Sequence, residues 1–404
     1  MNNCVITGMG VLSTAGLGSE EFWETLMNGK ITYGEIENFK DNPNFRIKIG
    51  AKIMDESWSK DLTSEMLEKY GRTSCYAIRT AVSAIKDSGL SKSDISDARV
   101  AICIGTTMGE IQVEEKISEI RHEDGINAIP QSLLDSYRTD IIGQAVKEAI
   151  GASGPVYVVP AACAAGNYAI ALGKRLLEWN IADVVIAGGV DVFSRVAFTG
   201  FQRLLSLTAD QCRPFSSNRK GLVVGEGCGM FVMEAGRHAK ARGTRVLGEI
   251  LSVGLTSDRY HMTAPHPEGD GAARAMENAI RDAGISKRDI DYISAHGTGT
   301  PANDKVESKA VIKVFGQDYV PPVSSIKSML GHAMGAASAL ELIASILMLE
   351  RQIILPTVNF IEADPECPVD CVPNKPREAK LECILSNSFA FGGQDSSLIV
   401  RKGW

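Results

Sequence analysis

Residues 158–173 read VVPAACAAGNYAIALG, and this stretch indicates the fold class. Two β-branched residues end a short apolar run, small residues surround Cys163, and an amphipathic helical pattern begins near Ala164. A buried strand that leads directly into a helix is the repeating unit of layered α/β proteins. Because the same unit recurs along the chain, we predict an α/β protein.

Short apolar runs bounded by glycine, proline or polar turns predict strands that are buried on both faces. They cover residues 4–12, 100–104, 156–159, 184–187, 230–233, 292–295 and 384–388. Helical periodicity covers residues 68–88, 134–150, 167–179, 271–283 and 336–350. Strands that alternate with helices predict largely parallel sheets. The pattern occurs twice, so we predict two packed halves, residues 1–243 and 244–404, joined near residues 236–244.

Composition excludes several classes of protein. The chain has 404 residues, of which 44% are hydrophobic and 23% charged, as in ordinary globular proteins. Its net charge of −7 disfavours general nucleic-acid binding, and the apolar run 4–12 is too short to span a membrane. Nine cysteines without metal-ligand spacing predict free thiols in the cytoplasm. We expect no metal or cofactor, and Cys367 and Cys371 have no histidine near them in the sequence.

Cys163 is the first candidate catalytic residue. A thiol at the start of a helix lies near the positive end of the helix dipole, which favours the thiolate. The alanines around it leave room for a substrate to reach the sulfur. The alternative is a structural cysteine, since cysteine is often buried.

His296 stands in the segment SAHGTGTPANDK, directly after the predicted strand 292–295. The carboxyl ends of such strands face the clefts of α/β proteins, so His296 is a candidate site residue. A helix is expected to resume near Lys305. The alternative is a core histidine with its hydrogen bonds satisfied.

His332 stands in KSMLGHAMGAAS, before the predicted helix 336–350. Its place at a helix start disfavours the imidazolium, so we predict a neutral ring. Lys327, five residues earlier, adds positive potential, and Glu341 can turn back to pair with it. The alternative for Lys327 and Glu341 is an ordinary surface ion pair.

The segment NSFAFGGQDSSLIV, residues 387–400, forms the last candidate motif. The two glycines after Phe391 allow a turn that brings main-chain N–H groups close to a ligand. A plain hairpin is the alternative.

Together, these residues favour chemistry on acyl thioesters. A thiolate attacks a thioester carbonyl and forms a covalent acyl-enzyme. Two neutral histidines and main-chain N–H groups stabilise a second carbonyl as it becomes an enolate. This division of labour serves carbon–carbon condensation between two acyl thioesters.

The sequence resembles the β-ketoacyl-acyl carrier protein synthases of the elongating Cys-His-His type, in the thiolase superfamily. Six blocks occur in the family's order over nearly the whole chain. They are VITGMGVLST (5–14), the segment around Cys163, RPFSSNRKGLVVGEGCG (213–229), HGTGTPANDK (296–305), KSMLGH (327–332) and FAFGG (389–393). Initiation-type and chalcone-type enzymes have asparagine in place of His332, and thiolases have cysteine in place of Phe391.

The resemblance implies a thiolase-like fold, with two similar βαβαβαββ halves in five layers, α/β/α/β/α. It also implies a decarboxylating condensation, in which Cys163 carries the acyl group while His296 and His332 hold the malonyl thioester. The amides of Cys163 and Phe391 would form the oxyanion hole, with Gly392 in the same turn and Phe391 as a moving gate.

Supporting roles follow from the same resemblance. Lys327 would orient and polarise the histidines, Glu341 would fix Lys327, and Asp304 would lie behind the first histidine. Met108 would limit the depth of the acyl pocket across a dimer. Acyl carrier protein, bearing acyl and malonyl groups, would be the partner, because the family's substrates arrive on an acidic carrier. The basic residues expected to contact it are Arg203, Lys60, Lys69 and Arg72.

Several positions depart from the family pattern. Ala161 and Ala165 replace hydroxyl residues around the cysteine, and Ala390, Gln394 and Asp395 change the last loop, which usually reads GFGGTN. Ala390 should restrict the hinge before the gate. The resemblance implies fatty acid or polyketide biosynthesis. These changes favour a specialised ketosynthase of a polyketide or secondary-metabolite pathway, with an unusual acyl donor.

Two other functions are open. One is a non-catalytic, chain-length-setting subunit of a heterodimer, and the other is a malonyl-carrier decarboxylase. Both kinds of relative tend to lack the cysteine, so Cys163 favours the enzyme. We expect a homodimer, with a heterodimer open, and neither nucleic acid nor membrane as partner.

Overall fold

Two five-stranded half-sheets meet along β1 and β8 in the computed structural model, which describes residues 3–404. The first half-sheet has the order β1-β7-β6-β4-β5 and the second β8-β14-β13-β9-β10. The strands of the first are β1 (Cys4–Ser13), β7 (Gly227–Ala235), β6 (Val184–Asp191), β4 (Val100–Gly105) and β5 (Val156–Val159). Those of the second are β8 (Gly248–Ser257), β14 (Gln394–Lys402), β13 (Cys383–Phe389), β9 (Tyr292–Ser294) and β10 (Val323–Ser324).

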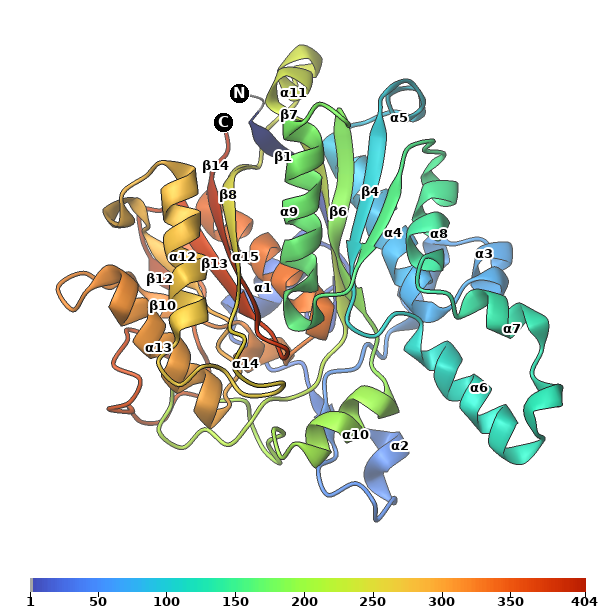
Figure 1. Cartoon of the computed structure of the whole chain (residues 1–404), viewed down its shortest axis with the longest axis horizontal. Helices are drawn as coiled ribbons and strands as arrows, with labels where there is room; N and C mark the ends of the chain where they lie inside the picture. Colours follow the sequence, from blue (N-terminus) through green and yellow to red (C-terminus); the bar gives the residue numbers. More distant parts are fainter. Residues whose placement is uncertain (1–2) are drawn as a thin grey trace.

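Helices cover both half-sheets and separate them, which makes five layers (Figure 1). The central layer, between the half-sheets, contains α9 (Ala165–Glu178) and α15 (Ala337–Arg351). The outer layers contain α4 (Arg72–Ser88) and α8 (Ile141–Ile150) on one side, and α12 (Asp270–Ala283) and α13 (Pro301–Phe315) on the other. The predicted five-layer arrangement is therefore confirmed.

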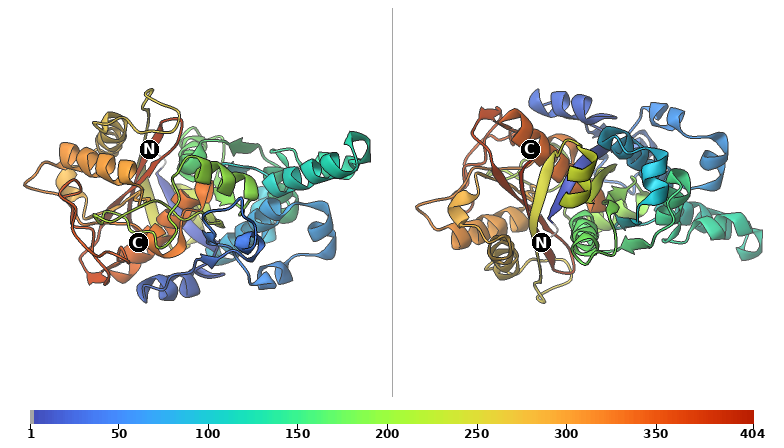
Figure 2. Two further views of the ribbon diagram at one scale, coloured as in Figure 1. Left: turned by 90° about the horizontal axis from the view of Figure 1, so that it is seen from below. Right: turned by 90° about the horizontal axis from the view of Figure 1, so that it is seen from above.

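Shorter elements lie around these layers. The helices are α1 (Ser19–Met27), α2 (Glu37–Lys40), α3 (Ser64–Lys69), α5 (Lys92–Asp97), α6 (Ile111–Glu123), α7 (Gln131–Ser136), α10 (Arg195–Arg203), α11 (Gly236–Arg242) and α14 (Lys327–Leu330). Small strand pairs join β2 (Gly34–Glu35) to β3 (Ile49–Gly50) and β11 (Ile353–Ile354) to β12 (Arg377–Glu378). Figure 2 shows that α6 and α7 project away from the rest of the molecule.

The strand directions differ from the prediction of largely parallel sheets. Strands β4, β5 and β6 pair in parallel, as do β9, β10 and β13, but β1, β7, β8 and β14 pair antiparallel with their neighbours. The sheet is therefore mixed. Strand β5 is also only partly buried, whereas two buried faces were predicted, because it lies at the free edge of its half-sheet.

One predicted helix, 68–88, is broken into α3 and α4 at Gly71. The buried carboxylate of Glu110 accepts hydrogen bonds from the N–H groups of Thr73 (3.3 Å) and Ser74 (2.7 Å). It thus caps α4 from outside the helix, and a Cβ on Gly71 would collide with it. Local periodicity cannot reveal a cap that comes from a distant residue. The predicted helix 134–150 is likewise divided, into α7 and α8.

Glycines let the two halves approach closely where β6, α9 and the turn before α15 meet. A Cβ on Gly189 would collide with the carbonyl oxygen of Gly335, and a Cβ on Gly166 would lie 2.6 Å from the Ser338 hydroxyl oxygen. Residues 337–349 of α15 are all buried. This close packing holds the segment after β5 against the segment before α15, and those segments carry the candidate site.

Within residues 3–404, no helix is long and apolar enough to cross a membrane. All nine cysteines are free and buried.

Candidate active site

Cys163 lies in a tight turn, Ala162–Ala164, between β5 and α9. Ala162 has a φ of 43°, a conformation that is costly for a residue with a Cβ. The turn places Cys163 in the wall of a cavity of about 260 Å³, which His296, His332 and Phe391 also line. The sequence-predicted nucleophile, both histidines and the gate residue therefore meet in one place.

The thiol itself differs from the prediction. Burial raises the pKa of the Cys163 thiol to about 12, although the charge of Lys327 and the main-chain N–H groups of Phe391 and Cys163 oppose the rise. The helix dipole at the start of α9 was expected to favour the thiolate. It does not prevail, because the sulfur is almost completely removed from water.

The two histidines form a buried pair. His296 follows β9, and His332 follows the short helix α14 rather than beginning a long helix. Their ring centroids are 5.3 Å apart, with an angle of 83° between the planes. Burial holds the pKa of each ring well below 6.5, and the charge of Lys327 lowers both further. Both rings are therefore neutral at pH 7, as predicted for His332, but burial is the main cause.

Main-chain contacts also determine the tautomer of His332. The N–H of Met334 donates a hydrogen bond to His332 Nδ1 at 3.1 Å. Since Nδ1 accepts this bond, the proton of the neutral ring is on Nε2. On His296, Nδ1 lies 3.5 Å from Lys327 Nζ, a donor, so its proton is also assigned to Nε2. Each ring thus offers an Nε2–H donor to a ligand.

Lys327 and Glu341 form an ion pair in the interior, where each is less than 3% exposed. The predicted pairing is confirmed, and the alternative of a surface pair is wrong. Lys327 Nζ also donates to the carbonyl oxygen of His296 at 2.6 Å. Burial raises the pKa of Glu341, and the Lys327 ammonium opposes this rise. Lys327 therefore connects Glu341 to the first histidine.

Glu307 is a site residue that the sequence reasoning missed. Its carboxylate accepts hydrogen bonds from the N–H groups of His296 and Gly297, both at 2.8 Å, and it is buried in α13. Burial raises its pKa to about 7. Glu307 follows Asp304 by three residues and therefore shares its face of the helix, which is the signal that could have revealed it.

Asp304 does not bind His296 directly, although the resemblance placed it behind this histidine. It accepts from the N–H groups of Phe215 at 2.9 Å and Gly299 at 3.2 Å, and it lies 3.9 Å from Arg219. It thus holds the glycine-rich loop, whereas Glu307 holds the histidine. The loop is short because α13 begins at Pro301, capped by the Thr300 side chain, four residues before the predicted start near Lys305.

The gate residue lies in the turn between β13 and β14. Phe391 packs against Phe201 of α10, with ring centroids 5.8 Å apart. Gly392 and Gly393 have φ values of 86° and 75°, which require glycine. Ala390 is not among the described residues with positive φ, so its methyl group causes no strain in this conformation.

The N–H of Gly392 donates to the carbonyl oxygen of Met262 at 2.8 Å, so it is not free to form the oxyanion hole. The N–H of Phe391, by contrast, lies close enough to the Cys163 thiol to oppose the rise in the pKa of that thiol. Gly392 therefore shapes the turn and does not bind the oxyanion.

The predicted peripheral residues are more scattered. Met108 is half-buried, donates from its N–H to Asp191, and is not among the residues that line the cavity of Cys163. Arg203 is exposed at the end of α10, next to the cavity-lining residues Phe201 and Leu205. Lys60 is also exposed.

Two candidate docking residues already have partners. Lys69 pairs with Glu148 at 2.8 Å. Arg72 pairs with Glu56 at 3.1 Å and lies over the ring of Trp58. Among residues 3–404, no group of three or more His, Cys, Asp and Glu side chains could hold a metal ion.

Comparison with known proteins agrees with this geometry. The family model described as "Beta-ketoacyl synthase, N-terminal domain" matches residues 1–239, and "Beta-ketoacyl synthase, C-terminal domain" matches residues 247–361. The chain belongs to the β-ketoacyl synthase family. This β-ketoacyl synthase is 35% identical to Nodulation protein E of Rhizobium meliloti (strain 1021) and 36% identical to 3-oxoacyl-[acyl-carrier-protein] synthase 2 of Coxiella burnetii, each with 98% of both chains covered.

Solved structures of other synthases are also similar to this β-ketoacyl synthase. "The ishigamide ketosynthase/chain length factor" matches with a TM-score of 0.95, 37% identity and 99% of both chains covered. A type II polyketide synthase "acyl-carrier protein in complex with its ketosynthase", AntDE:AntF, matches with a TM-score of 0.91, 31% identity and 99% of both chains covered. The predicted family and thiolase-like fold are therefore confirmed.

Proposed function

We propose that this β-ketoacyl synthase catalyses decarboxylating Claisen condensation of an acyl thioester with malonyl-acyl carrier protein. One observation carries the proposal: the Cys163 thiol, two neutral histidines and Phe391 line a single cavity. This set matches the two stages of the reaction, acyl transfer and carbon–carbon bond formation.

In the first stage, Cys163 Sγ attacks the carbonyl carbon of the acyl thioester. The N–H groups of Cys163 and Phe391 stabilise the oxyanion of the tetrahedral intermediate. The bond to the carrier's sulfur then breaks, and that sulfur leaves with the proton of the Cys163 thiol. Because burial keeps this thiol protonated, the proton has to leave as the carbon–sulfur bond forms.

In the second stage, the Nε2–H groups of His296 and His332 bind the carbonyl oxygen of the malonyl thioester. The malonyl group loses carbon dioxide, and its electron pair forms an enolate that the two donors stabilise. The enolate carbon attacks the acyl carbonyl and releases the Cys163 thiolate, which takes up a proton from water. Neutral rings suit this role because they donate without giving up a full proton.

We assign the partners on the same basis. The acyl and malonyl groups arrive on acyl carrier protein; the similar structure AntDE:AntF is an acyl-carrier protein in complex with its ketosynthase. We propose a homodimer, with the free edge of β5 available for pairing; a chain length factor, as named for the ishigamide relative, is the alternative partner. The free thiols favour the cytoplasm as location.

The departures around the cavity favour a specialised acyl donor. Asp395 and Asp258 line the cavity with the catalytic residues, and the family's usual asparagine is absent at Asp395. Because Cys163 and both histidines are present, we favour a catalytic subunit over a chain-length-setting subunit or a decarboxylase. Whether the donor belongs to fatty acid or polyketide synthesis is the substrate question that the experiment addresses.

Intact-protein mass measurement tests this proposal. The wild type, Cys163→Ala and Cys371→Ala are each incubated with a panel of acyl-carrier thioesters. We expect a gain of one acyl group in the wild type and in Cys371→Ala, a matched buried thiol outside the cavity, and no gain in Cys163→Ala. Addition of malonyl-carrier should then remove the acyl group as a 3-oxoacyl product. Absence of any acylated wild-type protein would contradict the proposal.

A further inference from the structure

Two acidic side chains lie together behind the gate turn. Asp258, directly after β8, and Asp395, in β14, both flank Gly271 at the start of α12: a Cβ on Gly271 would collide with one carboxyl oxygen of each. Both side chains also line the cavity of Cys163. Because Gly271 has no side chain, both carboxyl groups can lie against the same point of the main chain.

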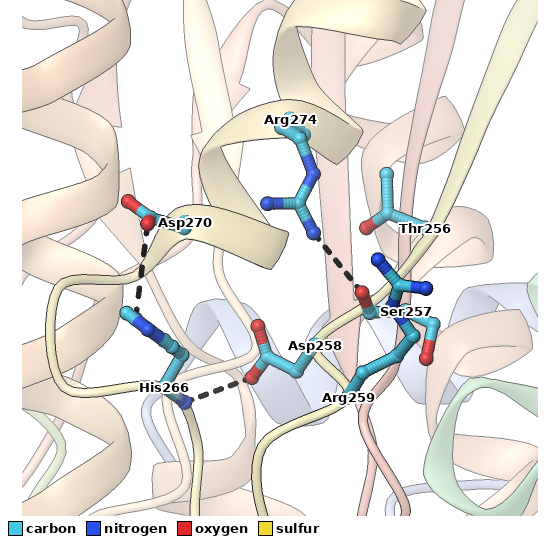
Figure 3. Close-up of a pocket in the computed structure, with 7 residues that line it drawn as sticks. All are labelled: Thr256, Ser257, Asp258, Arg259, His266, Asp270 and Arg274. Atoms are coloured by element: carbon cyan, nitrogen blue, oxygen red, sulfur yellow. Dashed lines mark hydrogen bonds and ion pairs between the residues drawn. The ribbon is translucent and has the colours of Figure 1, made fainter.

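The two carboxyl groups have very different partners. Asp258 accepts a hydrogen bond from the N–H of His266 at 2.9 Å (Figure 3). It accepts a second from the N–H of Gly271 at 3.1 Å. Asp395 is 3% exposed, and its Oδ2 has no hydrogen-bond partner. Within residues 3–404 neither forms an ion pair within 4.0 Å. An ionised Asp395 would therefore be a buried, unpaired charge beside a second carboxylate, which is strongly unfavourable.

The surrounding charges do not make ionisation of Asp395 beside Asp258 favourable. From α12, Arg274 faces the pair, but its Nη2 donates to the carbonyl oxygen of Ser257 at 3.0 Å, and Asp270 pairs with Lys313. From α9, Tyr168 faces Asp395. From the segment after β8 come Arg259 and His266 (Figure 3), together with His261. Burial raises the pKa of Asp395 to about 8, the charge of Asp258 adds to the rise, and Arg274 opposes it.

The same segments hold the gate turn in place. The N–H of Asp258 donates to the carbonyl oxygen of Gly393 at 2.9 Å, and the N–H of Gly392 donates to the carbonyl oxygen of Met262 at 2.8 Å. Asp258 therefore anchors the turn through its main chain and anchors the segment 258–266 to α12 through its side chain. Displacement of Asp258 would therefore disturb the turn that carries Phe391.

We propose that Asp395 keeps its proton beside the Asp258 carboxyl group, and that this acid pair fixes the gate turn over Cys163. Asp395 is thus a positioning residue, and this role rests on the proposed condensing function. While the proton is present, the carboxyl groups can lie together. When it is lost, the two carboxylates repel each other, Asp258 moves, and the turn loses its anchor.

Rate–pH profiles of Asp395→Asn and the wild type test the acid pair. The amide keeps the shape of the side chain and is neutral at every pH. We expect wild-type kcat for condensation, divided by kcat of the variant, to fall five- to tenfold from pH 8 to pH 9. The ratio is the readout because the Cys163 thiol is the same in both proteins. KM should change less than kcat, because the pair positions reacting groups.

Two further variants complete the experiment. Asp258→Asn also leaves a single carboxyl group, so wild-type kcat divided by the kcat of this variant should fall in the same way. This variant replaces Asp395→Asn in the test if Asp395→Asn does not fold. Asp270→Asn removes a neighbouring carboxylate outside the pair. The kcat of this variant should therefore fall between pH 8 and pH 9 as that of the wild type does. Identical profiles for all four proteins would overturn the acid pair while leaving the condensing function intact. Failure of the wild type to become acylated at any pH would instead contradict the proposed function.

Discussion

Lys327 adds to the effect of burial on the charge state of the cavity, because it is a buried residue that pairs with Glu341 and contacts His296. Its ammonium lowers the pKa of His296 and His332, which helps to keep both rings neutral, and it opposes the rise in the Cys163 pKa. These effects need Lys327 to be charged and correctly placed. Glu341 supplies the compensating charge. Replacing both residues together therefore separates the structural role of Lys327 from its role in catalysis.

Replacement of Lys327 by methionine should therefore affect both stability and activity. The single variant leaves Glu341 buried without its partner, which typically costs about 3–5 kcal/mol of unfolding free energy. Denaturant unfolding measures this loss. The double variant Lys327→Met/Glu341→Leu should recover most of the stability but stay at least about 100-fold less active. Recovery of activity in the double variant would show that Lys327 has only a structural role.

The sequence predicted which candidate side chains meet in one cavity better than it predicted their environment. Cys163, His296 and His332 were found from their positions at strand and helix ends, which local patterns reveal. The direction of the Cys163 pKa was missed because it depends on burial, which involves every element around the cavity. Glu307 was missed because only the fold shows that its carboxylate reaches the main chain of His296.

At the scale of elements, close approach of strand β6, helix α9 and the turn Met334–Ala336 brings the two halves of the site together. This approach depends on Gly189, which has space for no side chain against the carbonyl of Gly335. Overpacked sites force the neighbouring backbone to shift. The backbone that would shift here carries His332 on one side and Cys163 on the other.

Gly189→Ala should therefore reduce stability by about 1–3 kcal/mol and lower acylation of Cys163. The matched control is Gly200→Ala in α10, where a Cβ meets no atom within 4 Å. There the alanine should be neutral or stabilising by about 0.4–1 kcal/mol. Thermal unfolding and acyl-enzyme mass measure both effects. Equal behaviour of the two variants would show that β6 and the turn are not closely packed.

Elements with continuous apolar runs, such as β1 and β4, were predicted almost to the residue. Strand β8 was missed because its buried residues Ile250, Ser252 and Gly254 alternate with more exposed ones and include a polar side chain. Periodicity that shows one buried face gives a weaker signal than a fully apolar run. The boundary at residues 243 and 244 stays a prediction.

At the scale of the whole molecule, the net charge of −7 conflicts with binding of an acidic carrier. Local positive charge at the cavity mouth must compensate for it. Arg203 suits this role because it is exposed on α10, next to cavity-lining Phe201 and Leu205. Lys69 and Arg72 suit it less, since acidic neighbours already neutralise them.

Arg203→Glu should raise KM for the carrier-borne substrate about five- to tenfold with little change in kcat, because charges at the rim of an interface mainly affect association. Steady-state kinetics at low salt measure this effect, which should shrink as salt is added. Arg245→Glu is a matched control: it is exposed, pairs with Glu350, and does not line the cavity. An unchanged KM would remove Arg203 from the docking surface.

Strand β1 connects distant parts of the chain, since Cys4 pairs with both Ala235 and Ile250. During synthesis its first partner strand, β7, emerges more than 220 residues later. At about 5–20 residues per second, β1 waits about 10–45 seconds on the ribosome with an unpaired apolar backbone. Strand β1 therefore lacks its neighbours in the sheet until most of the first half has been synthesised, and such long-range pairing slows folding.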